Sequence, residues 1–244
     1  MQNQNQIYNN FTSGRKLLIV LIDPDKFDSP KAMLFFSKNK EHIDLIFVGG
    51  SLLEANRTEN VVEELKSVAI CPVVIFPGSS MQVVSNADAI LFLSLISGRN
   101  AEFLIGHHVQ AAPLIYNLGI EAIPTSYILV DGGKTTTVQY ITQTLPVPAD
   151  KPEIAAATAL AGKYSGHKLV YLEAGSGAIN HVSETMVAEV SQKTQLPVIA
   201  GGGIRNAEMA EKIVKAGATA IVVGTLYETN PDEIVRIAEK IHSL

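Results

Sequence analysis

The feature that most constrains this chain is a regular alternation of short apolar runs and longer amphipathic stretches. Leu17–Ile22 is apolar at every position, which is typical of a strand covered on both faces in a parallel sheet. Similar runs, most of them ending in Gly, Ser, Thr or Asp, follow at 44–50, 73–78, 89–94, 126–133, 168–175, 197–203 and 219–225. Strands that alternate with helical segments predict a parallel α/β fold.

Helical periodicity is clearest in the second half of the chain. Residues 207–217 place Met209 and Ile213 on one face and end at a glycine, which favours a helix that stops there. Ser183 is typical of the residue that caps the start of a helix, and the segment after it carries an apolar stripe. Pro231 followed by two acidic residues indicates the start of a last helix.

Eight strands in a chain of 244 residues predict a (β/α)₈ TIM barrel. We expect residues 1–244 to form one domain, with residues 1–14 as an N-terminal tail or first turn. The connection at 79–88 is too short for a regular crossover helix, so the helix after the third strand is predicted to be missing or reduced. Residues 131–152 contain three prolines and few charges, and we expect a long functional loop.

Composition excludes several classes of protein. A hydrophobic fraction of 47% is too high for a disordered chain, and the single cysteine, Cys71, excludes a disulfide framework and a multi-cysteine zinc site. A net charge of −5 argues against nucleic acid as a partner. The first residues lack the pattern of a signal peptide, and no apolar run is long enough for a transmembrane segment. We therefore expect a cytoplasmic protein.

Glycine clusters follow three neighbouring strands, in the segments 174–177, 201–205 and 222–225. Active sites of TIM barrels lie at the carboxyl ends of the strands, and the loops after strands seven and eight commonly bind phosphate there. Successive amides without a Cβ in the way can surround a phosphate group. The clusters therefore predict a phosphate site, with tight strand-to-helix turns as the alternative.

Two acidic residues follow the first strand, in the order Asp23-Pro24-Asp25. Carboxylates at the barrel mouth can hold Mg²⁺ together with substrate oxygens, and Ser51 at the end of the next strand supplies a further oxygen. Asp-Pro-Asp is also a common turn and helix cap, so this alternative stays open.

Glu173 lies in an apolar strand two residues before a glycine. Alternate residues of a strand share a face, so Glu173 and Tyr171 are expected to point together into the barrel mouth. Burial raises the pKa of a carboxyl group, which suits a general base. The alternative is a buried acid paired with a lysine or arginine.

Other side chains are expected to have packing roles. We expect His107 and His108 to be surface or packing residues of the helix after the fourth strand, and Cys71 to be a small buried apolar residue. Phe35, Phe36 and Phe103 are expected at core or interface positions. The segment GGGIRN lacks the spacing of a dinucleotide-binding fingerprint.

Six motifs follow one another along the chain: LIDPDK (21–26), FVGGS (47–51), FPGS (76–79), YLEAGSG (171–177), GGGIR (201–205) and VVGT (222–225). Together they resemble the motifs of the geranylgeranylglyceryl phosphate synthase family. The resemblance runs from about residue 15 to the C-terminus. The last two occur in many phosphate-binding barrels, whereas the combination of the first two with YLEAGSG is far more specific.

The resemblance implies a prenyltransferase that joins sn-glycerol 1-phosphate to a polyprenyl diphosphate, with Mg²⁺ required. By position, Asp23 and Ser51 would hold the metal, and Glu173 would take the proton of the attacking hydroxyl. The other residues implied in glycerol 1-phosphate binding are Tyr127, Tyr171, Leu172, Ala174, Gly175, Ser176, Gly177, Gly202, Gly203, Gly224 and Thr225.

The family also lacks a regular third helix, and its members form dimers or hexamers. An apolar groove for the prenyl tail, lined by Phe76 and residues 81–84, is expected where that helix is missing. Contact with a membrane would be transient and serve the release of lipid product.

Two other classes of protein remain as alternatives. One is a different phosphate-binding barrel, such as a sugar-phosphate isomerase or an enzyme like thiamin phosphate synthase. The other is a barrel that binds a phosphate ligand without catalysis. The two acids Asp23 and Glu173 argue against it, because a protein that only binds phosphate gains little from nearby negative charge. The sequence leaves open the prenyl chain length, the oligomer size, the fate of the product and whether Asp25 joins the metal site.

Overall fold

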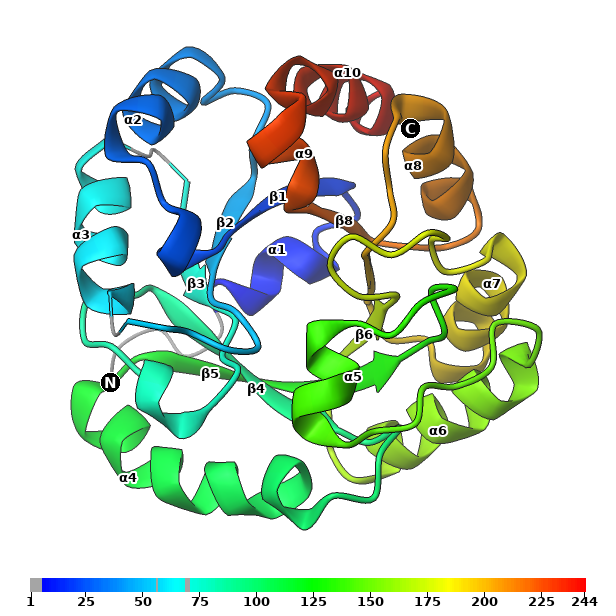
Figure 1. The fold of residues 1–244 in the computed structure, drawn as a ribbon. Coiled ribbons are helices and arrows are strands. Elements are labelled where there is room, and N and C mark those ends of the chain that lie inside the picture. Colours follow the sequence, from blue (N-terminus) through cyan, green and yellow to red (C-terminus); the bar gives the residue numbers. More distant parts are fainter. Residues whose placement is uncertain (1–5, 56, 69–70) are drawn as a thin grey trace.

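Eight parallel strands form a closed barrel in the order of the sequence, surrounded by helices (Figure 1). The computed structural model describes residues 6–55, 57–68 and 71–244. This architecture confirms the predicted TIM barrel. The strands are β1 (Leu17–Ile22), β2 (Leu45–Val48), β3 (Val73–Ile75), β4 (Ala89–Leu95), β5 (Glu121–Leu129), β6 (Leu169–Glu173), β7 (Val198–Gly201) and β8 (Ala220–Val223).

Helices form the outer ring, and they include the three predicted after Ser183, over residues 207–217 and from Pro231. Ser183 accepts a hydrogen bond from the Met186 amide and caps α7, and Asn206 caps α8 in the same way. A π-helical turn, Glu102–Gly106, precedes α4. The ring helices are α2 (Ser29–Lys38), α3 (Thr58–Val68), α4 (His107–Leu118), α6 (Pro152–Tyr164), α7 (Glu184–Thr194), α8 (Ala207–Lys215) and α10 (Pro231–His242).

Strand alternation divides the core into two clusters. Residues that point inward, such as Ile19, Phe47 and Tyr171, fill the barrel interior. Their neighbours along each strand, such as Val20 and Leu172, point outward and pack beneath the helices. Because parallel strands pair in register around the whole barrel, this alternation fixes which side chains reach the interior.

The connection between β3 and β4 contains no α-helix, although residues 76–88 are all described. A single 3₁₀ turn, Ser80–Gln82, occupies the position of the missing helix, which confirms the prediction. The buried Gln82 side chain fixes this connection: its Nε2 donates to the Gly50 carbonyl at 3.0 Å, and its Oε1 accepts from the Gly78 amide at 3.1 Å. The turn is therefore attached directly to the loop that follows β2.

The segment 131–152 differs from the long loop that the sequence led us to expect. It contains a short helix, α5 (Thr137–Thr142), and then returns to the barrel. The return is fixed by two backbone hydrogen bonds of Val147, one donated to the Leu129 carbonyl at 2.8 Å and one accepted from the Asp131 amide at 2.9 Å. A six-residue helix is too short to produce a visible apolar period. Together with α9 (Thr225–Thr229), α5 lies inside the ring of outer helices (Figure 1).

The N-terminal segment closes the opposite end of the barrel. Residues 1–5 lie outside the described residues, but Tyr8–Thr12 form a helix, α1, where only a tail or first turn was expected. Ile7 and Phe11 join the cluster that fills the barrel interior. The Glu121 carboxylate accepts hydrogen bonds from the amides of Ile7 at 2.7 Å and Tyr8 at 2.9 Å. Among the described helices, none is long and apolar enough to cross a membrane.

We expect Phe11→Ala to lower the free energy of unfolding by about 3–4 kcal/mol, because the ring is almost fully buried and its loss leaves a cavity. Denaturant titration measures this change. Thr12→Ala, at the neighbouring exposed position, is the control and should change the free energy by less than about 0.5 kcal/mol. Equal effects of the two substitutions would show that α1 does not close the barrel.

Candidate active site

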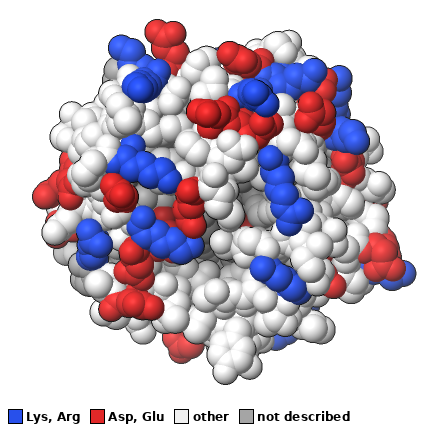
Figure 2. Space-filling model, turned by 45° about the horizontal axis from the view of Figure 1, so that its top comes forward, with Lys and Arg blue, Asp and Glu red and all other residues white. Residues whose placement is uncertain are grey.

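A cavity of about 500 Å³ opens at the carboxyl ends of the strands. Figure 2 shows one face of the molecule with a hollow that has acidic and basic side chains beside it. The cavity brings together nearly all the residues singled out from the sequence. These lining residues are Asp23, Ser51, Tyr127, Tyr171, Glu173, Gly175, Ser176, Gly177, Gly202, Gly203, Gly224 and Thr225.

Two residues of the predicted binding set do not line this cavity. The side chains of Leu172 and Ala174 are buried in the outer cluster, between the strands and the helices. The reason is strand alternation, since each follows a residue that points inward. The family motif at 171–177, taken as a whole, therefore includes two residues whose side chains face away from the cavity.

The glycine loops after β6 and β7 touch each other. Gly175 and Gly202 have φ angles of +97° and +81°, in the left-handed region that favours glycine. A Cβ placed on Gly202 would lie 2.6 Å from the Gly175 amide nitrogen, closer than a Cβ approaches a non-bonded atom. Any side chain at Gly202 would push the two loops apart. The close approach leaves backbone amides at the wall of the cavity, the arrangement that suits an anion.

Glu173 ends β6 at the floor of the cavity and is only 6% exposed. Its Oε1 accepts a hydrogen bond from the Gly175 amide at 2.6 Å. Burial raises the pKa of the carboxyl group from 4.5 to about 7, against the opposing effect of that amide. Within the described chain Glu173 forms no salt bridge, so the alternative of an acid paired with lysine or arginine does not hold. A carboxyl group with this pKa can accept a proton near neutral pH.

An aromatic cluster lies beside Glu173. The rings of Phe47, Phe76 and Tyr171 stack in sequence, and Tyr127 meets Phe76 and Tyr171 edge to face. Tyr171 Oη is close enough to Glu173 to lower the pKa of the carboxyl group, yet it has no partner at full hydrogen-bond geometry. A buried hydroxyl without a partner is costly, so this atom is suited to a polar group of a ligand.

Asp23 follows β1 and lines the same cavity, where it caps the 3₁₀ turn Pro24–Lys26 by accepting from the Asp25 amide at 3.0 Å. Partial burial raises its carboxyl pKa. Asp25 points elsewhere, since its oxygens accept from the amides of Glu54 at 2.6 Å and Ala55 at 3.3 Å. Asp25 therefore supports the loop that carries Ser51. The structure shows the turn and cap formed by Asp-Pro-Asp, and Asp23 also lines the cavity.

The donor set at this wall fits Mg²⁺ better than a metal that requires several protein ligands. In the described residues, no group of three or more His, Cys, Asp or Glu side chains gathers around one point. Two carboxylates, Asp23 and Glu228, line this wall together with Ser51, and Glu228 is paired with Lys26. Mg²⁺ commonly binds through one or two carboxylates and completes its shell with water and phosphate oxygens.

The cavity also includes residues to which sequence analysis gave no role. Lys26, Thr137, Val138, Arg205 and Glu228 all line it. Lys26 and Arg205 belong to the recognised motifs, so the signal was present in the sequence. Thr137 and Val138 were hidden in the segment taken for a loop, and Glu228 follows the last glycine motif without any distinctive pattern.

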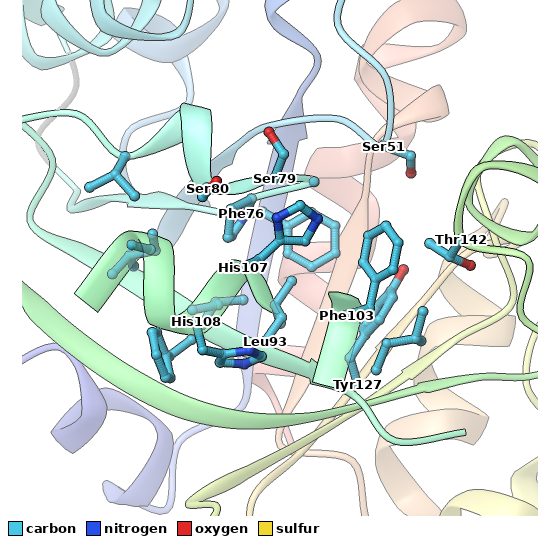
Figure 3. A pocket seen from close by; sticks show the side chains of 18 of the residues that line it. Ser51, Phe76, Ser79, Ser80, Leu93, Phe103, His107, His108, Tyr127 and Thr142 are labelled. Atoms are coloured by element: carbon cyan, nitrogen blue, oxygen red, sulfur yellow. The ribbon is translucent and has the colours of Figure 1, made fainter. Parts of the chain in front are cut away.

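A second, smaller pocket of about 80 Å³ lies beside the first, where the helix after β3 is missing (Figure 3). It is mainly apolar and contains Phe76, Val83 and Phe103, whereas Met81 is 77% exposed and does not line it. The expected groove thus includes only part of residues 81–84. The residues shared by both pockets are Gly50, Ser51, Phe76, Tyr127 and Val138.

The histidines and the cysteine have the local roles expected of packing residues, with one addition. His108 is buried against Ser94, with Nε2 and Oγ 3.0 Å apart, and His107 and His108 both line the apolar pocket (Figure 3). Burial raises the pKa of the Cys71 thiol to about 11, so the thiolate is scarce at neutral pH. Phe35 and Phe36 pack against Tyr227 in the outer core.

The closed parallel barrel, with its cavity at the carboxyl ends of the strands, places the chain among the TIM-barrel enzymes. Residues 10–241 match the model of the PcrB family. Two relatives, from Spirosoma linguale and Chitinophaga pinensis, are both called geranylgeranylglyceryl phosphate synthase. They are 47% and 46% identical to this chain, over 93% and 98% of its length and 91% and 97% of their own.

A solved structure is similar over its whole length. (S)-3-O-geranylgeranylglyceryl phosphate synthase of Thermoplasma acidophilum, in complex with its substrate sn-glycerol-1-phosphate, has a TM-score of 0.92 and 35% identity, with 100% of both chains covered. The chain belongs to the PcrB family, and the resemblance to the geranylgeranylglyceryl phosphate synthases is confirmed.

The raised pKa of Glu173 predicts a specific pH dependence of stability. A carboxyl group that binds its proton more tightly when folded stabilises the protein below about pH 4.5, and this contribution is lost as the pH rises through about 7. Relative to Glu173→Gln, the wild-type free energy of unfolding should therefore fall by about 3 kcal/mol across this range. Denaturant titrations of both proteins from pH 4 to pH 8 measure the difference, and a constant difference would contradict the assignment.

Proposed function

We propose that this chain joins sn-glycerol 1-phosphate to a polyprenyl diphosphate, forming an ether bond and releasing diphosphate in a Mg²⁺-dependent reaction. One observation carries the proposal. A buried carboxyl group with a pKa near 7 lies between glycine-edged loops and an acidic wall in one cavity, in a chain similar to an enzyme bound to sn-glycerol-1-phosphate.

The acceptor occupies the side of the cavity formed by the loops after β6, β7 and β8. Its phosphate is held by backbone amides of residues 176–177, 202–203 and 224–225, while the Gly175 amide donates to Glu173. This position fixes the glycerol hydroxyl near Glu173, which accepts the proton as the oxygen attacks. The hydroxyl groups of Tyr127 and Tyr171 lie on the same side and orient the glycerol.

The donor diphosphate lies at the wall formed by Asp23 and Ser51, which would hold the Mg²⁺. When bound, Mg²⁺ neutralises the charge that develops on the departing diphosphate. The prenyl tail extends into the apolar pocket beside Phe76 and Val83. Since both pockets share Phe76 and Tyr127, the bond that breaks lies close to these two rings.

In the transfer, the bond between the allylic carbon and the diphosphate oxygen breaks, and its electron pair leaves with the diphosphate. The glycerol oxygen forms the new bond to that carbon, and its proton passes to the Glu173 carboxylate. Two separated substrates are thus converted to one ether lipid and free diphosphate.

The proposal extends to the assembly and location of the protein. We expect one barrel domain per chain, a homo-oligomer of two or six copies and a cytoplasmic location, with product released through transient membrane contact. Exposed apolar side chains on the ring helices and α5 support self-association. These are Val109 at 65%, Tyr116 at 87% and Tyr140 at 70% exposure.

Incubation of the wild-type protein with labelled geranylgeranyl diphosphate and glycerol 1-phosphate should yield a labelled ether lipid. Glu173→Gln should reduce turnover by about 100-fold or more, because the base is lost, while calorimetry shows glycerol 1-phosphate still bound. Glu189→Gln changes a partly exposed carboxylate of α7 that is paired with Lys193, and it serves as the control. Absence of ether from the wild-type protein would favour another phosphate-binding barrel activity, and full turnover by Glu173→Gln would remove Glu173 from the mechanism.

Asp23→Asn should raise the Mg²⁺ concentration needed for half-maximal activity by about tenfold or more, since the carboxylate facing the diphosphate is lost. The comparison is Asp28→Asn, because Asp28 caps α2 and asparagine caps a helix equally well. The measurement is a Mg²⁺ titration of the initial rate after treatment with a chelator. An unchanged midpoint in Asp23→Asn would place the metal elsewhere.

A further inference from the structure

A lysine and a glutamate bridge the cavity wall between the turn after β1 and helix α9. Lys26 Nζ lies 3.0 Å and 3.2 Å from the two carboxylate oxygens of Glu228, and 4.0 Å from Asp23 Oδ2. Both Lys26 and Glu228 line the cavity. The turn that carries Lys26 begins at Asp23, and α9, which carries Glu228, begins at Thr225. The contact thus joins the donor wall to the acceptor loop.

This ion pair contributes little to the stability of the fold. The side chains of Lys26 and Glu228 are 55% and 35% exposed, and water screens the attraction in ion pairs as exposed as this one. The attachment of α9 also has a second support, because Lys31 Nζ donates to the Glu228 carbonyl at 3.0 Å and lies over the Tyr227 ring. A purely structural role leaves the position of Lys26 on the cavity wall unexplained.

A diphosphate bound at the wall formed by Asp23 and Ser51, here called the donor wall, requires a positive charge nearby, and Lys26 supplies one. Among the described residues that line the cavity, Lys26 and Arg205 are the cations. Arg205 lies on the acceptor side, where its Nη2 donates to the Ala178 carbonyl at 2.7 Å. A diphosphate beside Asp23 carries several negative charges next to a carboxylate, and an ammonium group 4.0 Å from Asp23 Oδ2 is placed to compensate them.

We propose that Lys26 binds the donor diphosphate through its ammonium group, and that Glu228 is the residue that positions Lys26 for this contact. The proposal rests on the function proposed above and adds a residue to it. During transfer the allylic carbon–oxygen bond breaks, its electron pair leaves with the diphosphate, and the ammonium group donates hydrogen bonds to that product without losing its proton. Glu228 holds the long lysine side chain over the wall before the donor arrives, which reduces the entropy lost on binding.

The first test compares Lys26→Met with Lys31→Met. Lys31 also contacts Glu228 but does not line the cavity, so its substitution removes a similar charge from the same helix contact. We expect Lys26→Met to raise KM for the prenyl diphosphate, and the inhibition constant of inorganic diphosphate, by about tenfold or more. The affinity for glycerol 1-phosphate should stay within about twofold, and Lys31→Met should resemble the wild type in all three measurements.

A second pair of variants tests whether Lys26 binds the diphosphate or only links the two loops. Lys26→Arg keeps the positive charge and should restore most of the diphosphate affinity. Glu228→Gln leaves the ammonium group in place, so its effect should be smaller than that of Lys26→Met. Equal losses in Glu228→Gln and Lys26→Met, accompanied by weaker glycerol 1-phosphate binding, would show a structural link and overturn the proposal.

The outcomes also distinguish this proposal from the function on which it rests. If the wild-type protein forms the ether and Lys26→Met retains wild-type KM and diphosphate inhibition, the role of Lys26 is wrong while the function stands. If the wild-type protein forms no ether, the proposed function itself fails, and with it the assignment of Lys26.

Discussion

Closure of the eight-stranded barrel is the constraint on which the site depends. In a closed parallel barrel every strand delivers its carboxyl end to the same rim, so residues far apart in the chain meet there. Asp23 and Thr225 are separated by almost the whole sequence, yet they line one cavity because β1 pairs with β8. Without this pairing, the acidic turn and the glycine loops could not contact the same ligand.

Burial of Glu173 gives this rim its chemical character. A carboxyl group at an exposed loop would be fully ionised at neutral pH and a weak base. At the end of β6, surrounded by aromatic rings and with one amide hydrogen bond, the same group has a pKa of about 7. The protein loses stability when this group ionises, and that cost is the physical counterpart of its ability to take a proton. The inward position follows directly from strand alternation.

The sequence was sufficient for features that depend on local periodicity and on residue type. The strands, the cap at Ser183, and the loss of the helix after β3 all follow from short segments of sequence. Features that depend on contacts between residues far apart in the sequence could not be predicted from it. Helix α5 is too short to show a period, and α1 is defined by the contact of its amides with Glu121, 113–114 residues away. For the same reason a role for Glu228 could not be predicted, because its partner Lys26 lies 202 residues away in the sequence.

The absence of the helix after β3 shapes the site as much as any residue that is present. A regular helix there would cover β3 and β4 and leave no space beside Phe76. In its place Gln82 attaches a short turn to Gly50, and an apolar pocket remains between that turn and α4. Gly50 and Ser51 border both this pocket and the polar cavity, so the loop after β2 has one side facing each of them. A molecule with an anionic head and an apolar tail fits such a boundary, because each part meets surroundings of its own polarity.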